Sequence, residues 1–295
     1  MPGHLQPAAA CLLTLALWPF PAAALDQHDI AALIKLRPSV LKVEASDDKG
    51  NVSVGTGVAV GPGIIATACH VTARATTIRV VSNGERMQVS SQRAQVGRDL
   101  CLLDVPGASQ VPVVELRSTP LKPGEELVAL GYILGAAPRV SNGMVLQLHP
   151  HDGANVIQST TPFTSGASGG GLFDREHRLV GVMTFKFRSG TDNQFSLPVK
   201  WIREGLALPA GADVAPLSGQ AFWNESETAL PAFLQTLRLL FLRPGQAISP
   251  RAQAVVEFVH YVLWDLGLKV GSAFRSIGET LTLARDDMTV RTTLL

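Results

Sequence analysis

Three short segments carry side chains that could act together in nucleophilic catalysis. His70 stands in residues 67–71 at the end of an apolar run, Asp99 opens a second apolar run, and Ser168 lies in the glycine-rich sequence GASGGG. A serine hydroxyl is a weak nucleophile, so an imidazole must accept its proton. A buried carboxylate must orient that imidazole and offset its charge. These residue types therefore predict a catalytic triad of His70, Asp99 and Ser168.

The turn around the serine can also supply the donors that a tetrahedral oxyanion needs. In its G-x-S-G sequence the backbone N–H groups of Gly166 and Ser168 are candidates for an oxyanion hole. Gly166 allows a backbone conformation that other residues resist, and we expect Gly169 and Gly170 to keep side chains away from the substrate. The turn is thus predicted to provide both the nucleophile and the oxyanion hole.

The order of the three residues separates two kinds of serine hydrolase. The pattern G-x-S-x-G also fits the nucleophile elbow of α/β-hydrolases, which place the acid and the base after the serine. The histidines downstream of Ser168 are His177, which is too close in sequence, and His260, which lies in a helical pattern. The order His70, Asp99, Ser168 in a β-rich chain is that of chymotrypsin-like enzymes.

The elements that must position these residues are short strands. Between residues 39 and 208, brief apolar runs alternate with turn sequences such as Gly61-Pro62-Gly63 and Asn83-Gly84, and helical periodicity is nearly absent. Many short antiparallel strands with such punctuation predict an all-β sandwich or barrels. Residues 120–123 fall near the middle and could join two halves.

The pattern changes after residue 208. Residues 209–220 resemble a linker, and residues 226–242 have apolar side chains at helical spacing. Ser249 and Pro250 are typical of a helix start and predict a second helix. The last segment predicts a hairpin. We therefore expect a mainly α-helical C-terminal extension over residues 209–295.

Composition and the N-terminus limit the partners and the compartment. With 46% hydrophobic residues, 17% charged residues and a net charge of +1, the chain can bury a core and has no charge excess that favours nucleic acid. Residues 8–20 form an apolar run too short to span a bilayer, and three alanines follow. We predict a signal peptide over residues 1–24, a mature chain from Leu25 without a membrane span, and a periplasmic or secreted location.

Residues 39–208, which are 170 of the 295 residues, resemble the protease domain of the HtrA/Deg family of trypsin-like peptidases. The resemblance rests on GTGVAVGPGIIATACHV, LKPGEELVALGYILG, VSNGMVLQL, VIQSTTPFTSGASGGGLFD, LVGVMTF and QFSLPVKWI, which follow the family's order. It implies a protease domain over residues 25–208 with two six-stranded β-barrels, about 37–118 and 119–208. It places His70 and Asp99 in the first barrel and Ser168 in the second.

The chain departs from the family pattern at a few positions. Ala167 stands where asparagine is usual, Gly171 where proline is usual, and Cys69 where asparagine is common. None of these positions supplies a triad side chain. Residues 209–295 show no pattern of a PDZ domain, so the peptide sensing that depends on such domains is not expected here.

Two cysteines, Cys69 and Cys101, remain after removal of the signal peptide, which contains Cys11. One flanks His70 and the other lies two residues past Asp99. Because the base and the acid must touch, the cysteines should be neighbours, and an oxidising compartment favours a disulfide between them. The alternative is two separate buried thiols that pack as small apolar side chains.

A substrate pocket is expected from two segments that follow the serine, the second extending to Leu197. Its predicted lining residues are Thr184, Phe185, Lys186, Gln194, Phe195 and Ser196. Pro162 stands where trypsin-like specificity for Arg or Lys would need an aspartate, so small or medium apolar side chains are the expected substrates. His149 and His151 lack a third ligand, are interpreted as exposed polar residues, and no metal or cofactor is predicted.

The sequence thus predicts a serine endopeptidase that cleaves protein or peptide substrates through an acyl-enzyme. Two alternatives remain open. One is a catalytically latent, protease-like binding module of the cell envelope, and the other is an esterase that uses the same triad. Beside these, Arg238 and Arg243 next to an apolar run suit either a membrane surface or, as we favour, a helix packed on the protease domain.

Overall fold

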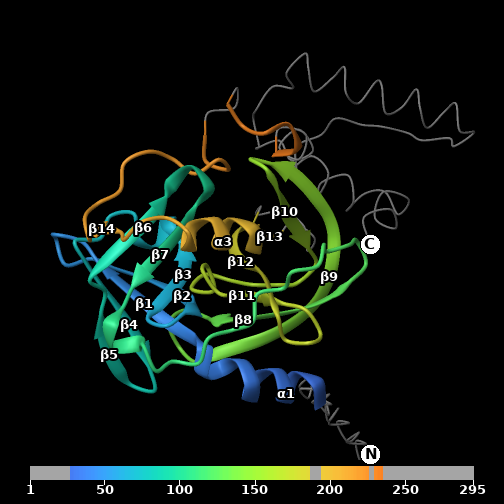
Figure 1. Cartoon of the computed structure of the whole chain (residues 1–295), viewed down its shortest axis with the longest axis horizontal. Helices are drawn as coiled ribbons and strands as arrows, with labels where there is room; N and C mark the ends of the chain where they lie inside the picture. The colour runs from blue at the N-terminus through green and yellow to red at the C-terminus, as the bar shows by residue number, and fades with distance from the viewer. Residues whose placement is uncertain (1–26, 187–193, 226–228, 235–295) are drawn as a thin grey trace, which may run out of the picture.

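The described part of the chain is mostly β-strand, arranged in two groups. The structure is a computed structural model that describes residues 27–186, 194–225 and 229–234. The strands of the first half of the chain lie on one side and those of the second half on the other (Figure 1). All strand pairs within both groups are antiparallel. The predicted all-β class is therefore confirmed.

The first group, here called the open sheet, contains eight strands in the order β14-β6-β7-β3-β2-β1-β4-β5. Their bounds are β1 (Val40–Ser46), β2 (Val52–Gly61), β3 (Ile64–Ala68), β4 (Thr77–Ser82), β5 (Glu85–Gln88), β6 (Ser91–Gln95), β7 (Leu100–Asp104) and β14 (Ala212–Asp213). The resemblance implies a six-stranded barrel here, whereas the hydrogen-bonded order of the described strands has two ends. One end is β14, which follows the strands of both groups in the chain and pairs with the edge of β6.

The second group, here called the closed barrel, has six strands in the order β10-β13-β12-β11-β8-β9. Their bounds are β8 (Glu126–Tyr132), β9 (Pro138–His151), β10 (Ala154–Ser159), β11 (Gly171–Phe173), β12 (Leu179–Lys186) and β13 (Gln194–Pro198). The expected six-stranded barrel is present in this half. Closure removes the free edges that a sheet otherwise exposes.

Two-residue turns join hairpins in both groups. Asn83 and Gly84 connect β4 to β5 with φ of 50° and 88°, and Asp152 and Gly153 connect β9 to β10 with φ of 43° and 73°. Positive φ at both positions is what a type I′ turn requires, and Asn, Asp and Gly adopt it most readily. The turn sequences therefore fix these hairpins locally.

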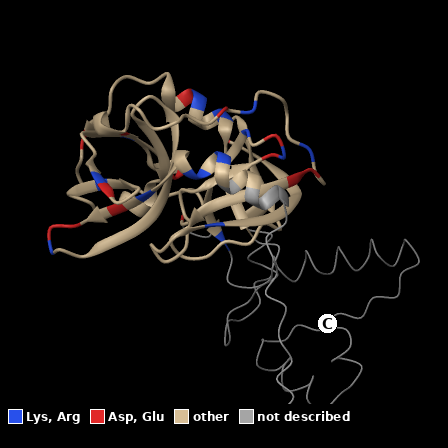
Figure 2. Cartoon of the chain, turned by 90° about the horizontal axis from the view of Figure 1, so that it is seen from below, with Lys and Arg blue, Asp and Glu red and all other residues tan. Residues whose placement is uncertain are grey.

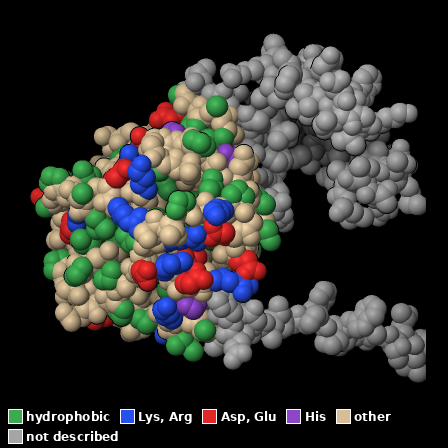
Figure 3. Space-filling view, turned by 45° about the vertical axis from the view of Figure 1, so that its right-hand side comes forward, with side chains coloured by type: hydrophobic (Ala, Val, Ile, Leu, Met, Phe, Trp, Pro, Cys, Tyr) green, Lys and Arg blue, Asp and Glu red, His purple; other side chains and the backbone are tan. Residues whose placement is uncertain are grey.

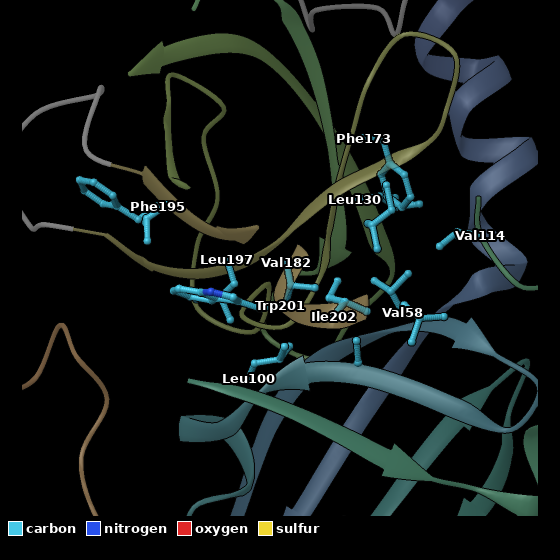
Figure 4. Packing of buried hydrophobic residues seen from close by; sticks show 14 of the residues in the cluster. Val58, Leu100, Val114, Leu130, Phe173, Val182, Phe195, Leu197, Trp201 and Ile202 are labelled. Atoms are coloured by element: carbon cyan, nitrogen blue, oxygen red, sulfur yellow. The ribbon is translucent and has the colours of Figure 1, made fainter. Parts of the chain in front are cut away.

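A shared apolar core holds the two groups together. It includes Val58 and Leu100 from the open sheet and Leu130 and Phe173 from the closed barrel, all buried (Figure 4). Helix α3 (Val199–Leu206) lies at this junction and turns Trp201 and two neighbours inward. The interface is thus as apolar as a domain core, which keeps the two groups in a fixed relation.

Three 3-10 turns and two further helices complete the described elements. They are α1 (Gln27–Leu36), α2 (Cys69–Thr72), η1 (Arg37–Ser39), η2 (Val96–Arg98) and η3 (Pro106–Ala108). Helix α1 leads into the first strand through η1. It buries Ala32 and Leu36 in the shared core.

Residues 209–225, here called the return segment, run back along the open sheet after α3 (Figure 1). Strand β14 pairs with β6, and the Gln92 side-chain amide donates to the Ala215 carbonyl at 3.0 Å. The stretch that the sequence suggests as a linker therefore lies on the open sheet.

Several predicted features lie outside the described residues. They are the signal peptide, most of the helix over residues 226–242, the helix that starts at Ser249 and the terminal hairpin. Within the described ranges, no helix has the length and apolarity needed to cross a membrane.

Charged side chains of both signs are mixed over the described chain (Figure 2) and on the face drawn in Figure 3. Arg98 is one example, because its guanidinium binds the carboxylates of Asp152 and Glu204 at 2.5 and 2.7 Å. The Arg98 hydrogen bond holds the pKa of Asp152 below its usual range. These ion pairs tie the turn before Asp99 to the β9–β10 hairpin and to α3.

Candidate active site

His70 is placed by the end of β3, where the chain turns into the single helical turn α2. The Cys69 amide donates to the Asp99 carbonyl at 2.8 Å, which continues the pairing of β3 with β7 for one more residue. The His70 amide donates to Asp99 Oδ1, also at 2.8 Å. Main-chain bonds therefore bring the two residues together before their side chains meet.

The Asp99 carboxylate is almost completely buried, with 1% of the side chain exposed. The His70 Nδ1 atom lies 2.7 Å from Asp99 Oδ2, and the same oxygen accepts hydrogen bonds from Thr184 Oγ1 and, at 3.1 Å, from Trp223 Nε1. A carboxylate oxygen accepts here, so the proton sits on Nδ1 and Nε2 remains free to act as a base. Both carboxylate oxygens thus have donors, which offsets the cost of burial.

Asp99 was expected to be the first residue of an apolar strand, but it lies just before that strand. It follows η2 with φ of 59°, in the left-handed region, and β7 begins at Leu100. Aspartate is among the few residues that occupy this region readily. The left-handed turn gives the carboxylate a direction of its own, separate from the alternation of the strand.

A disulfide joins Cys69 to Cys101, with a distance of 4.9 Å between their Cα atoms. Both residues are buried in the core of the open sheet, at 2% and 0% exposure. The bond links the residue before the base to the strand after the acid. The pairing that the sequence predicts is therefore present, and the alternative of two separate thiols is not.

The serine turn is held by Thr56 of β2, a fully buried residue of the open sheet that the sequence analysis did not single out. Its hydroxyl donates to the Gly166 carbonyl at 2.7 Å, and its amide donates to the Ser168 carbonyl at 2.8 Å. These bonds cross from the open sheet to the turn that belongs to the closed barrel. They set the position of Ser168 relative to His70.

Glycine is required at two positions of this turn for different reasons. Gly166 has φ of 92° and Gly169 has φ of 87°, a region that other residues avoid. A Cβ on Gly169 would also come within 2.0 Å of the Thr56 carbonyl oxygen. We expected Gly169 to leave room for substrate, whereas the structure shows that it makes room for the open sheet.

The amides of Gly166 and Ser168, predicted as the oxyanion hole, donate no hydrogen bond within the described residues. The amide between them, that of Ala167, is bonded to the Thr164 carbonyl at 3.0 Å. Two unpaired N–H groups, separated by one that is paired, are the donors that a developing oxyanion could use.

The Ser168 hydroxyl is hydrogen-bonded to the main chain of the closed barrel. Its Oγ donates to the main-chain carbonyl of Thr184 at 3.3 Å, and no hydrogen bond joins it to His70 in the described part of the chain. Catalytic hydrogen bonds are often long or absent without substrate. Asp99 and His70 are therefore hydrogen-bonded to each other, whereas Ser168, the predicted nucleophile, is bonded to Thr184.

The six residues predicted for the substrate pocket have different surroundings. Thr184 directs its hydroxyl to Asp99, and Phe185 stacks on Phe195 with 4.7 Å between ring centroids. Lys186 is exposed and its Nζ donates to the Phe163 carbonyl at 3.1 Å. Gln194 and Ser196 are buried on β13, and among the described residues neither Gln194 Oε1 nor Ser196 Oγ has a hydrogen-bond partner. Residues 187–193, between the two predicted segments, lie outside the described residues.

His149 is wrongly interpreted from sequence as an exposed residue. It is buried, at 6% exposure, its Nε2 lies 2.8 Å from Gln158 Oε1, and its ring stacks on Phe233 with 4.4 Å between centroids. His151 is half-buried and its ring lies 4.7 Å from that of Phe222. Burial lowers the pKa of both imidazoles. The error arose because the aromatic partners come from residues far along the chain.

Trp223 is the site residue that sequence reasoning missed altogether. It follows a stretch interpreted as a linker and has no motif around it. Its indole N–H reaches Asp99 Oδ2, and its ring lies at 5.5 Å from that of His70 in an edge-on arrangement. Only the path of the return segment brings it to the site.

Comparison with known proteins identifies one family model that matches the chain. Residues 55–182 match the family model of the trypsin-like peptidase domain. That range contains His70, Asp99 and Ser168 together with both cysteines of the disulfide.

Solved protease structures share the fold. The active form of the Rv3671c protease from M. tuberculosis is 21% identical, with a TM-score of 0.58, covering 74% of this chain and 99% of that one. The HtrA-type protease AlgW with a tripeptide is 25% identical, with a TM-score of 0.52, covering 59% and 61%. The serine endoprotease from Yersinia pestis is 24% identical, with a TM-score of 0.51, covering 59% and 63%.

A short match joins the chain to curated proteins of another kind. The bifunctional uridylyltransferase/uridylyl-removing enzyme from Caulobacter vibrioides is 51% identical over 57 residues, which are 19% of this chain. The chain spans 6% of the length of that enzyme, so the match does not extend the enzyme's activity to this protein.

Proposed function

Because residues 55–182 form a trypsin-like peptidase domain, which makes this chain a trypsin-like serine endopeptidase, we propose that it cleaves protein substrates through an acyl-enzyme formed on Ser168. His70 serves as the general base and Asp99 holds it in place. The observation that carries the proposal is the Asp99 carboxylate, which is buried, fully hydrogen-bonded and 2.7 Å from His70 Nδ1.

The proposed reaction begins with a rotation of the Ser168 side chain from the Thr184 carbonyl towards His70 Nε2. The imidazole then removes the Oγ proton while Oγ bonds to the substrate carbonyl carbon, and the electron pair of the C=O bond moves to its oxygen. Asp99 stabilises the imidazolium. The N–H groups of Gly166 and Ser168 stabilise the oxyanion.

Collapse of this intermediate breaks the C–N bond, and His70 gives its proton to the leaving amine. Water then enters, loses a proton to His70 and attacks the acyl carbon. The second tetrahedral intermediate expels Ser168 Oγ, which regains its proton from His70, and a carboxylic acid is released. No metal or cofactor takes part in this scheme.

The substrate pocket is proposed to lie between the segments 184–186 and 194–196. Pro162, Phe163 and Phe185 are apolar, so we propose small or medium apolar side chains at the cleaved residue. We also propose that the chain is exported and begins at Leu25 once its signal peptide is removed. Mass spectrometry of the mature N-terminus tests this, and an intact Met1 in the cytoplasm contradicts it.

A second candidate is the latent, protease-like binding module. The observation in its favour is the Ser168 hydroxyl, which donates to the Thr184 carbonyl instead of to the base. In such a module the hydroxyl would keep this bond when a peptide is bound, and no acyl-enzyme would form.

Fluorophosphonate labelling with peptide mapping distinguishes the two candidates. We expect one adduct on Ser168 in the wild type and none in Ser168→Ala, with cleavage of casein lost in the same variant. An unlabelled wild type that binds casein without cleaving it supports the latent module. Hydrolysis of a small ester with no cleavage of casein would instead indicate an esterase.

A further inference from the structure

The return segment is fastened to the open sheet beside both ends of the acid–base pair. The Leu217 amide donates to the Ala73 carbonyl at 2.8 Å, just past the helical turn that carries the base. The Phe222 amide donates to the Gly97 carbonyl at 2.9 Å, two residues before the acid. Main-chain bonds of this kind define where the following residue lies. That residue is Trp223.

Trp223 contacts three parts of the site at once. Its Nε1 donates to Asp99 Oδ2 at 3.1 Å. Its ring meets the His70 ring edge-on, with centroids 5.5 Å apart and an interplanar angle of 89°, and it stacks on Phe185 at 5.1 Å and 21°. The indole therefore covers the carboxylate and flanks the imidazole, while its other face is held by the closed barrel.

We propose that Trp223 is a positioning residue of the pair formed by His70 and Asp99. It belongs to the return segment, which follows both the open sheet and the closed barrel in the chain. It holds the Asp99 carboxylate towards His70 and keeps water from it. This inference rests on the proposed function, because a pair that performs no proton transfer needs no such support. The return segment would then support catalysis by holding Trp223 in place.

The physical effect of the indole follows from charge and burial. The attraction between Asp99 and the imidazolium increases as the local dielectric constant falls, so water admitted next to the carboxylate weakens it. The imidazolium exists in the transition state and not in the ground state, so the loss appears in the chemical step. Trp223 should thus affect kcat more than KM.

Two substitutions separate the hydrogen bond from the ring. Trp223→Phe keeps an aromatic ring and removes the N–H, and Trp223→Ala removes both. Trp201→Phe is the matched control, because the Trp201 indole N–H is also bonded, to the Asp152 carbonyl at 3.0 Å, and does not reach the triad. Each rate is divided by the concentration of active sites titrated with a fluorophosphonate, so that misfolded protein does not count.

We expect kcat to fall about fivefold in Trp223→Phe with KM unchanged, since the N–H contributes one hydrogen bond of ordinary strength. In Trp223→Ala we expect a fall of about 50-fold in kcat, because water then reaches the carboxylate. Trp201→Phe should match the wild type in kcat, whatever it does to the melting temperature.

The inference is overturned if kcat per titrated site stays within twofold of the wild type in both Trp223 variants. It is also overturned if the fall in Trp201→Phe equals that in Trp223→Phe, since the loss would then reflect packing in general. A wild type that neither labels nor cleaves peptides overturns the proposed function first. The two failures are therefore distinguishable.

Discussion

The two halves of the proposed triad differ in how many hydrogen bonds hold their side chains. On the open sheet, His70 and Asp99 are joined by two hydrogen bonds, flanked by a disulfide and covered by Trp223. On the closed barrel, the serine turn is held firmly by Thr56, yet the Ser168 hydroxyl is bonded to the Thr184 carbonyl. The backbone of both halves is thus in place, and the proposed mechanism needs one further rotation of the Ser168 side chain.

This difference has a physical reason. A buried carboxylate costs a great deal of free energy unless it is paired, so the acid–base half must be complete in the folded protein. A serine hydroxyl is neutral and finds an acceptor in either position at similar cost. The hydrogen bonds of the charged pair must therefore form on folding, whereas in the proposed mechanism the neutral serine can change its acceptor when substrate binds.

The largest effect should come from removing the nucleophile. Ser168→Ala should lower kcat/KM for peptide cleavage by roughly 10⁴- to 10⁶-fold, and adding His70→Ala should lower it little further because triad members act as a unit. Steady-state cleavage of a fluorogenic peptide measures both. Substantial activity in Ser168→Ala would break the comparison, since the serine half would then not be catalytic.

The next largest effect should come from the acid. Asp99→Asn should lower kcat by about 10⁴-fold, because an amide can hold the wrong tautomer of His70. The folded fraction of the variant, followed by circular dichroism, serves as the control. A loss in kcat of less than tenfold would mean that the hydrogen bond between Asp99 and His70 contributes little to the rate.

The disulfide should affect stability more than chemistry. The loop between the cysteines spans 32 residues, and its closure should stabilise the chain by about 3–4 kcal/mol in the chain-entropy model. Reduction should therefore lower the melting temperature of the wild type and leave that of a Cys69→Ser/Cys101→Ser variant unchanged. Equal behaviour of the two proteins under reduction would contradict the presence of the bond.

Thr184 is hydrogen-bonded to both Asp99 and Ser168, so a substitution of its hydroxyl tests the contact with Asp99 separately. Its Oγ1 donates to Asp99 while its carbonyl accepts from Ser168. Thr184→Val should lower kcat about tenfold, the value of one hydrogen bond to a charged group. Thr161→Val is the matched control, because the buried Thr161 hydroxyl has no hydrogen-bond partner in the described part of the chain. A similar loss in both variants would point to packing.

The smallest effect is the pH dependence of stability that comes from His149, whose ring stacks on Phe233. Burial places the folded-state pKa of His149 below its ordinary value, so the unfolded chain binds the proton more readily. Stability should therefore fall as the pH is lowered through about 6.5 towards the folded-state pKa. His149→Phe retains the ring next to Phe233 and should show a weaker dependence of melting temperature on pH. An identical slope in both proteins would exclude His149 as its source.

The sequence by itself determined the class of fold and the assignment as a serine endopeptidase. The residue types and the order His70, Asp99, Ser168 underlie the proposed reaction, and the turn residues between short apolar runs specify antiparallel strands. The closeness of Cys69 and Cys101 followed from the triad, because residues beside the base and the acid must be neighbours. These features depend on short stretches of chain or on one catalytic requirement.

Only the tertiary structure decided which distant residues complete the site. Trp223 lies 124 residues from Asp99 along the chain, and Thr56 lies 110 residues from the Gly166 carbonyl that it binds. Local patterns report which face of a strand is buried, and they carry no record of which segment covers it. Strand β14 could not be predicted for the same reason. Its two residues are too few to form a pattern and acquire strand geometry only by pairing with β6.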